Sequence, residues 1–64
     1  MMLTEDQKKV WMAISEGREM EILDHTGWRI ISNAAIKTWI MGAILRRVHD
    51  GYIRIASKEK IKAQ

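Results

Sequence analysis

The sequence predicts one small α+β domain, and three patterns lead to this fold class. Apolar residues recur at helical spacing near the amino terminus, a long apolar helical segment follows in the second half, and a short alternating run comes after it. We expect a helix at 4–16, a short element at 19–31, a long helix at 33–49 and a strand at 52–56. The chain has 64 residues and buries only about 60% of its unfolded surface, so residues 1–64 form a single domain with a small core.

The first helix has both a start and a stop signal. Thr4 can act as its N-cap, with Gln7 at the return position of a capping box. Gly17 suits the left-handed position just past the helix end. The apolar stripe between these signals consists of Val10, Trp11 and Ile14.

The segment after the first helix fits two structures. Read as strands, residues 20–23 and 28–31 flank a turn at 24–27, which begins with aspartate and ends with glycine, as type I turns often do. Read as a helix, residues 19–26 would form two turns and stop at the glycine. The isoleucines and tryptophan of the second arm favour a strand there, whereas the first arm fits either state. The alternative fold is therefore helix–β-hairpin–helix–strand.

The long helix at 33–49 is unusually apolar. Ser32 or Asn33 can cap its start, and Gly51 ends it. Its apolar arc covers more than half the circumference, which predicts a central helix packed on two sides. Gly42 costs about 1 kcal/mol against alanine in a helix, and a close approach of another element would explain it. The apolar positions are Ile36, Trp39, Ile40, Met41, Ala43, Ile44, Leu45 and Val48.

Positive charge gathers in the second half of the chain. Residues 1–32 hold four Lys/Arg and six acids, a net charge of −2, whereas residues 33–64 hold seven Lys/Arg and two acids, a net charge of +5. A basic half on a small domain favours a polyanionic partner, and it is equally typical of a solvated surface that keeps a protein soluble.

The run LRRVHDGYI at residues 45–53 resembles the end of the recognition helix and the following strand in winged-helix transcription regulators. This resemblance implies a winged-helix-like domain, in which residues 19–26 supply the second helix, residues 33–49 the recognition helix and residues 52–64 a short wing. In that family the amino-terminal half of the recognition helix reads base edges and the wing touches phosphates. The resemblance thus assigns Asn33, Lys37 and Thr38 to bases, and Arg54, Lys58, Lys60 and Lys62 to phosphates.

Two arginines and one tryptophan add to this candidate nucleic-acid surface. Arg46 and Arg47 end the long helix, where they can contact phosphate or simply complement the helix dipole. Trp28 follows a turn glycine and precedes an arginine, so it is a candidate exposed aromatic contact for unpaired bases. Trp11 and Trp39 lie on apolar stripes and are expected in the core.

The residues give little support to other classes of protein. There is no cysteine, and the two histidines would have to converge from distant places to bind a metal, so we expect no metal site. No nucleophile motif or phosphate-binding glycine loop is present, so we expect neither enzyme activity nor a cofactor. The longest apolar stretch, residues 39–45, is too short to span a bilayer, and we expect a cytoplasmic protein.

Two functional hypotheses follow. The first is a small regulator that binds double-stranded DNA through its basic carboxyl-terminal half, of the size that phages and mobile elements often carry. The alternative is a protein-interaction module or inhibitor that docks on a larger protein, which fits the hairpin fold because a hairpin leaves sheet edges open. In both cases we expect a homodimer, because the core is small and the long helix exposes more apolar surface than one chain can cover.

Overall fold

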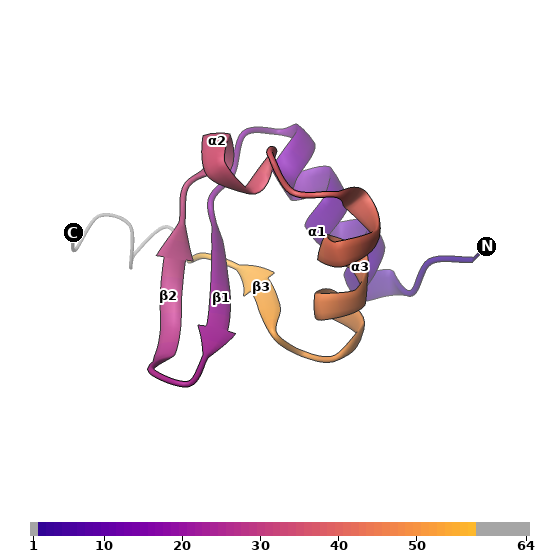
Figure 1. Cartoon of the computed structure of the whole chain (residues 1–64). Coiled ribbons are helices and arrows are strands. Elements are labelled where there is room, and N and C mark those ends of the chain that lie inside the picture. Colours follow the sequence, from indigo (N-terminus) through magenta and orange to yellow (C-terminus); the bar gives the residue numbers. More distant parts are fainter. Residues whose placement is uncertain (1, 58–64) are drawn as a thin grey trace.

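The computed structural model describes residues 2–57. The fold places three helices beside a three-stranded antiparallel sheet, with α1 and α3 packed against each other and α2 above the hairpin (Figure 1). The elements are α1 (Glu5–Ser15), β1 (Met20–Asp24), β2 (Gly27–Ile31), α2 (Asn33–Ile36), α3 (Met41–His49) and β3 (Ile53–Ile55).

The first helix forms where the sequence predicts it. The Thr4 hydroxyl accepts a hydrogen bond from the Gln7 N–H at 3.1 Å, and the Gln7 side chain accepts one from the Thr4 N–H at 2.8 Å. This confirms the capping box. The left-handed conformation expected at Gly17 is also confirmed, with a φ of +88°. Trp11 is only partly buried against the core, and the fully buried residues of α1 are Val10, Ala13 and Ile14.

Residues 20–31 form an antiparallel hairpin. The strand reading of this segment is therefore confirmed, and the helix over 19–26 that the winged-helix layout requires is wrong. The Asp24 side chain stabilises the turn, because its Oδ1 accepts a hydrogen bond from the Thr26 N–H at 2.8 Å. Gly27 adopts a φ of +109°, as the fourth position of the turn demands.

The single long helix expected at 33–49 is wrong, because residues 37–40 separate α2 from α3. Thr38 Oγ1 donates a hydrogen bond to the Ala35 carbonyl at 2.7 Å, a local bond that competes with helix continuation. Trp39 and Ile40 follow, and aromatic and β-branched residues are weak helix formers. Ile40 is extended, with a ψ of 134°.

The break changes which apolar residues are buried. In one continuous helix, Ile36, Ile40 and Ile44 would lie on the same stripe at four-residue spacing. Instead Ile36 and Ile44 are buried, whereas Ile40 is 80% exposed. Met41 is exposed as well, so the expectation that this whole segment is packed on two sides is wrong. A core this small has room for only part of the apolar arc.

The last strand is one residue shorter at each end than the predicted strand 52–56. Gly51 ends α3 with a φ of +83°, as expected. Backbone bonds nevertheless extend the ladder beyond the strand. The Leu23 N–H donates to the Tyr52 carbonyl at 2.8 Å, and the Ala56 N–H donates to the Glu19 carbonyl at 3.1 Å.

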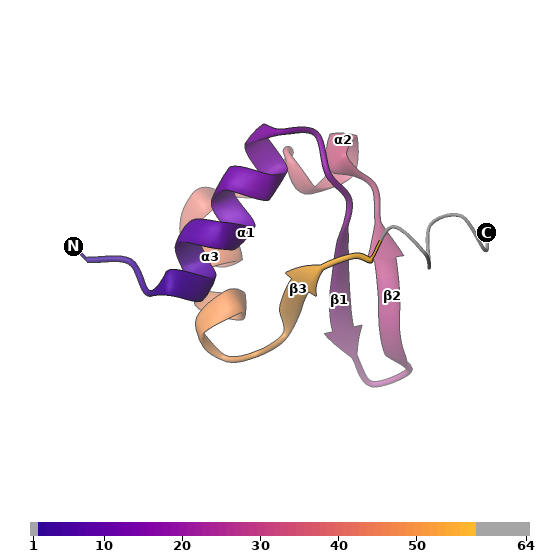
Figure 2. The same cartoon turned by 180° about the vertical axis from the view of Figure 1, so that it is seen from behind.

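The sheet has the order β2-β1-β3, so β1 lies in the middle. Met20 is paired with Ile31 on one side and with Ile55 on the other, and these three side chains face the helices. Both views place β3 between the helices and β1, with the hairpin turn away from α2 (Figures 1 and 2). The fully buried side chains with the largest volume are Met20, Ile36 and Ile44.

The helices of this fold are short. Among residues 2–57 none of them has the length and apolar character needed to cross a membrane.

Gly42 offers a test of helix stability in α3. A Cβ atom built at this position would meet no other atom within 4 Å, so the close approach expected from the sequence is wrong. We expect Gly42→Ala to raise the free energy of unfolding by roughly 0.5–1 kcal/mol, because alanine loses less backbone entropy than glycine on folding. Urea unfolding measures this change. The matched control is Gly51→Ala, which we expect to destabilise the fold because Gly51 has a positive φ. A stabilising effect at both positions would contradict the explanation.

Candidate interaction surface

The outer face of the sheet carries a buried acid covered by an arginine. Glu21 lies in the middle of β1, and its side chain is only 5% exposed. Arg54, its pairing partner on β3, donates a hydrogen bond from Nε to Glu21 Oε1 at 3.1 Å. The Arg54 guanidinium carbon also lies 3.8 Å from the centre of the Trp28 ring on β2. Arg54 therefore spans the sheet from β3 to β2 and shields the Glu21 carboxylate from water.

The hydrogen-bond pattern shows which strand edges are open. Leu23 and Glu19 bond to β3 through their backbones, so the odd-numbered residues of β1 bond to β3 and the even-numbered residues bond to β2. It follows that alternate residues of the outer strands direct their backbone N–H and C=O groups away from β1. Outside the sheet ladder, no backbone hydrogen bond among residues 2–57 uses these groups. These outward N–H and C=O groups belong to Trp28 and Ile30 on β2, and to Ile53 and Ile55 on β3.

A groove of about 410 Å³ lies between α1 and β3. Val10 from α1, Val48 from α3 and Ile53 from β3 line its apolar part, and all three side chains are buried. Ile55 from β3 and Trp28 from β2 also line the groove. The charged residues of the lining are Asp6, Lys9 and Arg54.

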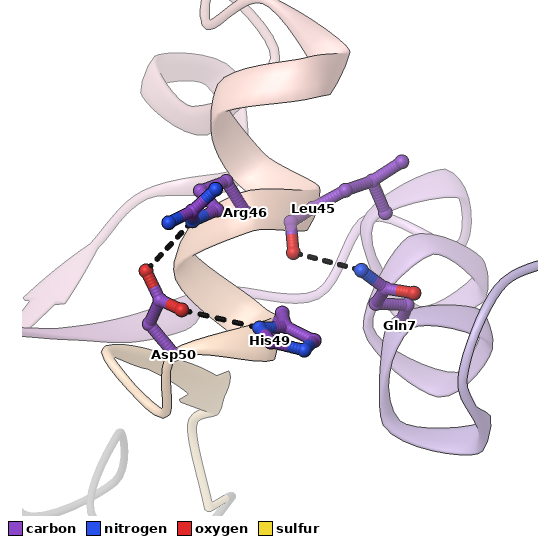
Figure 3. A network of polar contacts seen from close by, with 5 residues as sticks. All are labelled: Gln7, Leu45, Arg46, His49 and Asp50. Carbon is purple, nitrogen blue, oxygen red and sulfur yellow. Dashed lines mark hydrogen bonds and ion pairs between the residues drawn. The ribbon is translucent and has the colours of Figure 1, made fainter.

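A polar network marks the carboxyl-terminal end of α3 (Figure 3). Arg46 Nε donates to Asp50 Oδ2 at 3.0 Å, and His49 Nδ1 lies 3.1 Å from Asp50 Oδ1. These contacts with His49 and then Arg46 lower the pKa of Asp50 below its usual range. Gln7 Nε2 donates to the Leu45 carbonyl at 3.0 Å and joins α1 to α3. Asp50 therefore neutralises part of the positive charge at the carboxyl-terminal end of α3.

Two of the residues assigned to base recognition make hydrogen bonds within the domain. Asn33 Nδ2 donates to the carbonyls of Ile14 and Arg18, both at 2.9 Å, and so joins the start of α2 to the end of α1. The Thr38 hydroxyl bonds to α2, as described above. Lys37 follows α2 and is exposed.

The arginines assigned to phosphate contacts have partners within the domain. Arg46 pairs with Asp50, Arg54 pairs with Glu21, and the Arg47 guanidinium carbon lies 4.9 Å from the centre of the Trp39 ring. The assigned cations Lys58, Lys60 and Lys62 lie outside the described residues. Residues 2–57 contain eight Lys/Arg and seven acids, a net charge of +1. The rest of the chain's net charge of +3 lies outside these residues, where three Lys and one Glu stand.

Of the residues assigned from the sequence, the structure brings Trp28 and Arg54 together, and it groups Arg46 with Arg47 at the end of α3. Sequence reasoning missed Glu21, because an acid between apolar neighbours on a strand usually points into solvent. It also missed Lys9, which lies on the polar side of α1. The only sequence signal for Glu21 is its place in an alternating strand pattern, opposite to the side that Met20 and Ile22 occupy.

Metal-ligating residues do not converge in the part of the chain that the structure describes. No group of three or more His, Asp or Glu residues there is placed to hold a metal ion.

Comparison with known proteins gives no relatives. No protein-family model, curated protein or solved structure matches the chain. The function is therefore inferred from the surface of the molecule alone.

The contact between Arg54 and Glu21 can be measured by a double-mutant cycle. We expect Arg54→Met to lower the free energy of unfolding by about 1–2 kcal/mol, because the Glu21 carboxylate loses a charged hydrogen bond in a site that water barely reaches. This loss is at the low end for a hydrogen bond between charged groups, because Arg54 is half-exposed and water screens the pair. In a Glu21→Gln background the same substitution should cost less. Chemical denaturation of all four proteins tests this, and strictly additive effects would show that the pair is not coupled.

Asp24 should make the hairpin sensitive to acid. Hydrogen bonds from the Thr26 side chain and backbone, followed by the ion pair with Arg29, lower the pKa of Asp24 from 3.8 to about 2. A carboxylate with a lowered pKa stabilises the fold above its unfolded pKa and loses this contribution as the pH falls through the folded value. We expect the difference in Tm between the natural chain and Asp24→Asn to be constant above pH of about 5 and to shrink toward pH of about 2. A difference in Tm that stays constant over this pH range would contradict the lowered pKa of Asp24.

Proposed function

We propose that this domain is a protein-interaction module that binds an extended segment of a partner at an edge of its sheet. The observation that carries this proposal is the pair of open strand edges. The outward N–H and C=O groups of Trp28, Ile30, Ile53 and Ile55 are arranged to accept another strand, and backbone hydrogen bonds supply affinity in this mode of binding.

The distribution of charge supports a protein partner over a polyanion. Phosphate binding needs cations on an exposed ridge, and each contact releases counterions. In this domain Arg46 and Arg54 are each paired with an acid, and Asn33 is bonded to the end of α1. Releasing Arg54 or Asn33 for nucleic acid would cost contacts that stabilise the fold.

Exposed apolar side chains support the same proposal. Ile40 and Met41 are neighbours at the start of α3 and are 80% and 44% exposed. Tyr52, beside β3, is 50% exposed. Large apolar side chains on a small surface are typical of a contact region for another protein. A second copy of the chain is one partner that would cover them, which keeps the homodimer as a proposal.

Selection of displayed random peptides on the immobilised domain tests the proposal. We expect enrichment of sequences in which apolar and polar residues alternate, because an added strand presents alternate side chains to opposite faces of the sheet. Amide hydrogen exchange should then show slower exchange at the outward amides of β2 or β3 when an enriched peptide is bound. Sedimentation of the free domain measures self-association separately. No enrichment, or slower exchange only on the helices, would overturn the proposal.

A second candidate function, binding of double-stranded DNA, is favoured by one observation. Arg46, Arg47 and His49 are all exposed on the last turn of α3, which follows α2 in a helix–turn–helix order. With phosphate contacts from Arg46 and Arg47, the affinity for a labelled duplex would fall about 12-fold between about 50 mM and 200 mM salt. The protein-interaction proposal predicts weak binding to the duplex, and Arg47→Ala should then leave it unchanged. A steep salt response that Arg47→Ala reduces would favour DNA.

A further inference from the structure

The two edges of the sheet differ in the room that they offer to another strand. At one edge, α1 packs against β3, and Ile53 on β3 is buried. At the other edge, β1 is the only element of residues 2–57 that packs closely against β2. Both views place β2 at the end of the sheet opposite β3 (Figures 1 and 2). An added strand therefore fits beside β2.

The strand β2 lacks the features that keep edge strands from pairing. Natural edges commonly carry a lysine, a proline or a bulge that hinders the approach of another strand. The sequence of β2 contains neither lysine nor proline, and its pairing with β1 is continuous over all five residues. Its one charged residue is Arg29, whose Nε donates to Asp24 Oδ2 at 2.6 Å. The edge of β2 thus presents open backbone groups beside a cation that already has a partner.

The residues on either side of the open groups restrict how two copies of β2 can pair. The outward N–H and C=O groups of the strand belong to Trp28 and Ile30. At the next outward positions, the Thr26 N–H is bonded within the hairpin turn and the Ser32 carbonyl accepts a bond from α2. Two antiparallel copies therefore use all the open groups only when Trp28 of each copy pairs with Ile30 of the other. A shift of this register in either direction would place an open residue opposite position 26 or 32.

The side chains also suit this register. Trp28 lies beside Ile30 of the second copy on the outer face, and an aromatic residue next to a β-branched one is a favourable cross-strand pair. Arg29 lies opposite Arg29 of the second copy, on the other face of the sheet. Like charges at such positions repel, but the ion pair of each Arg29 with Asp24 offsets the repulsion.

We propose that two copies of the chain pair through their β2 strands, antiparallel, with Arg29 at the two-fold axis. The three strands of each copy then form one continuous sheet of six strands. The same surface is used on both copies, as is usual in dimers with two-fold symmetry. This inference rests on the proposed function, for which it identifies the edge and the partner.

Cysteine cross-linking tests the register, because the chain contains no cysteine of its own. In the proposed dimer the two residues at position 29 form a non-hydrogen-bonded pair with Cα atoms about 4.5 Å apart, which a disulfide can bridge. We expect Arg29→Cys to form a covalent dimer in a glutathione redox buffer. The matched control is Ile30→Cys on the same strand. Its two Cα atoms would lie about 7–8 Å apart, so we expect at least about five-fold less covalent dimer.

Sedimentation tests the dimer without a cross-link. We expect the natural chain to associate reversibly at micromolar concentration. Ile30→Lys should raise the Kd of the dimer at least about ten-fold, because it replaces the apolar contact with Trp28 by a lysine of the kind that protects natural edges. The matched control is Ile40→Lys, the same substitution at a residue that is 80% exposed and lies outside the sheet. This control should leave the Kd unchanged.

The outcomes separate this inference from the proposed function. Equal cross-linking at positions 29 and 30, or a dimer that Ile40→Lys weakens and Ile30→Lys does not, would overturn pairing through β2. A natural chain that stays monomeric while enriched peptides slow exchange at the β2 amides would overturn the second copy as partner and leave strand addition in place. No association and no enriched peptide would overturn both. The amide spectrum of each variant shows whether it is folded.

Discussion

The central position of β1 is the constraint on which the rest of the structure depends. Its even-numbered residues bond to β2 and its odd-numbered residues bond to β3, so each residue of this strand is fixed from one side by backbone bonds. The same arrangement makes β2 and β3 the edges of the sheet. It also places Glu21 at the centre of the outer face, where Arg54 from the neighbouring strand donates a hydrogen bond to it.

The sequence predicts features that depend on local interactions. The capping box at Thr4, the hairpin turn with Gly27 and the helix end at Gly51 all rest on residues within a few positions of each other. The contact between Arg54 and Glu21 joins residues 33 positions apart, and no local pattern indicates it. The break before Ile40 was missed for a different reason. Helical periodicity describes which residues share a face, but it does not tell how much of that face the remaining elements can cover.

The charge pattern illustrates the difference between composition and surface. The second half of the chain is strongly basic, yet in the described residues Arg54 pairs with Glu21 of the first half and Arg46 pairs with Asp50 of its own half. The resemblance at residues 45–53 concerns a helix end and a strand start, which the structure does contain. The strand conformation of residues 20–24 departs from the winged-helix layout, because that layout needs a helix there. The same hairpin provides the open edges from which the proposed function is argued.

The two ladders of β1 join residues at very different distances along the chain, and this difference has a consequence for the order of folding. The pairs between β1 and β2 close a short turn, so the hairpin can form early and locally. The ladder between β1 and β3 must bring together residues about thirty positions apart, and the entropy of closing that loop grows with its length. The rate of folding should therefore be limited by the pairing of β3 with β1, the contact in the sheet that closes the longest loop.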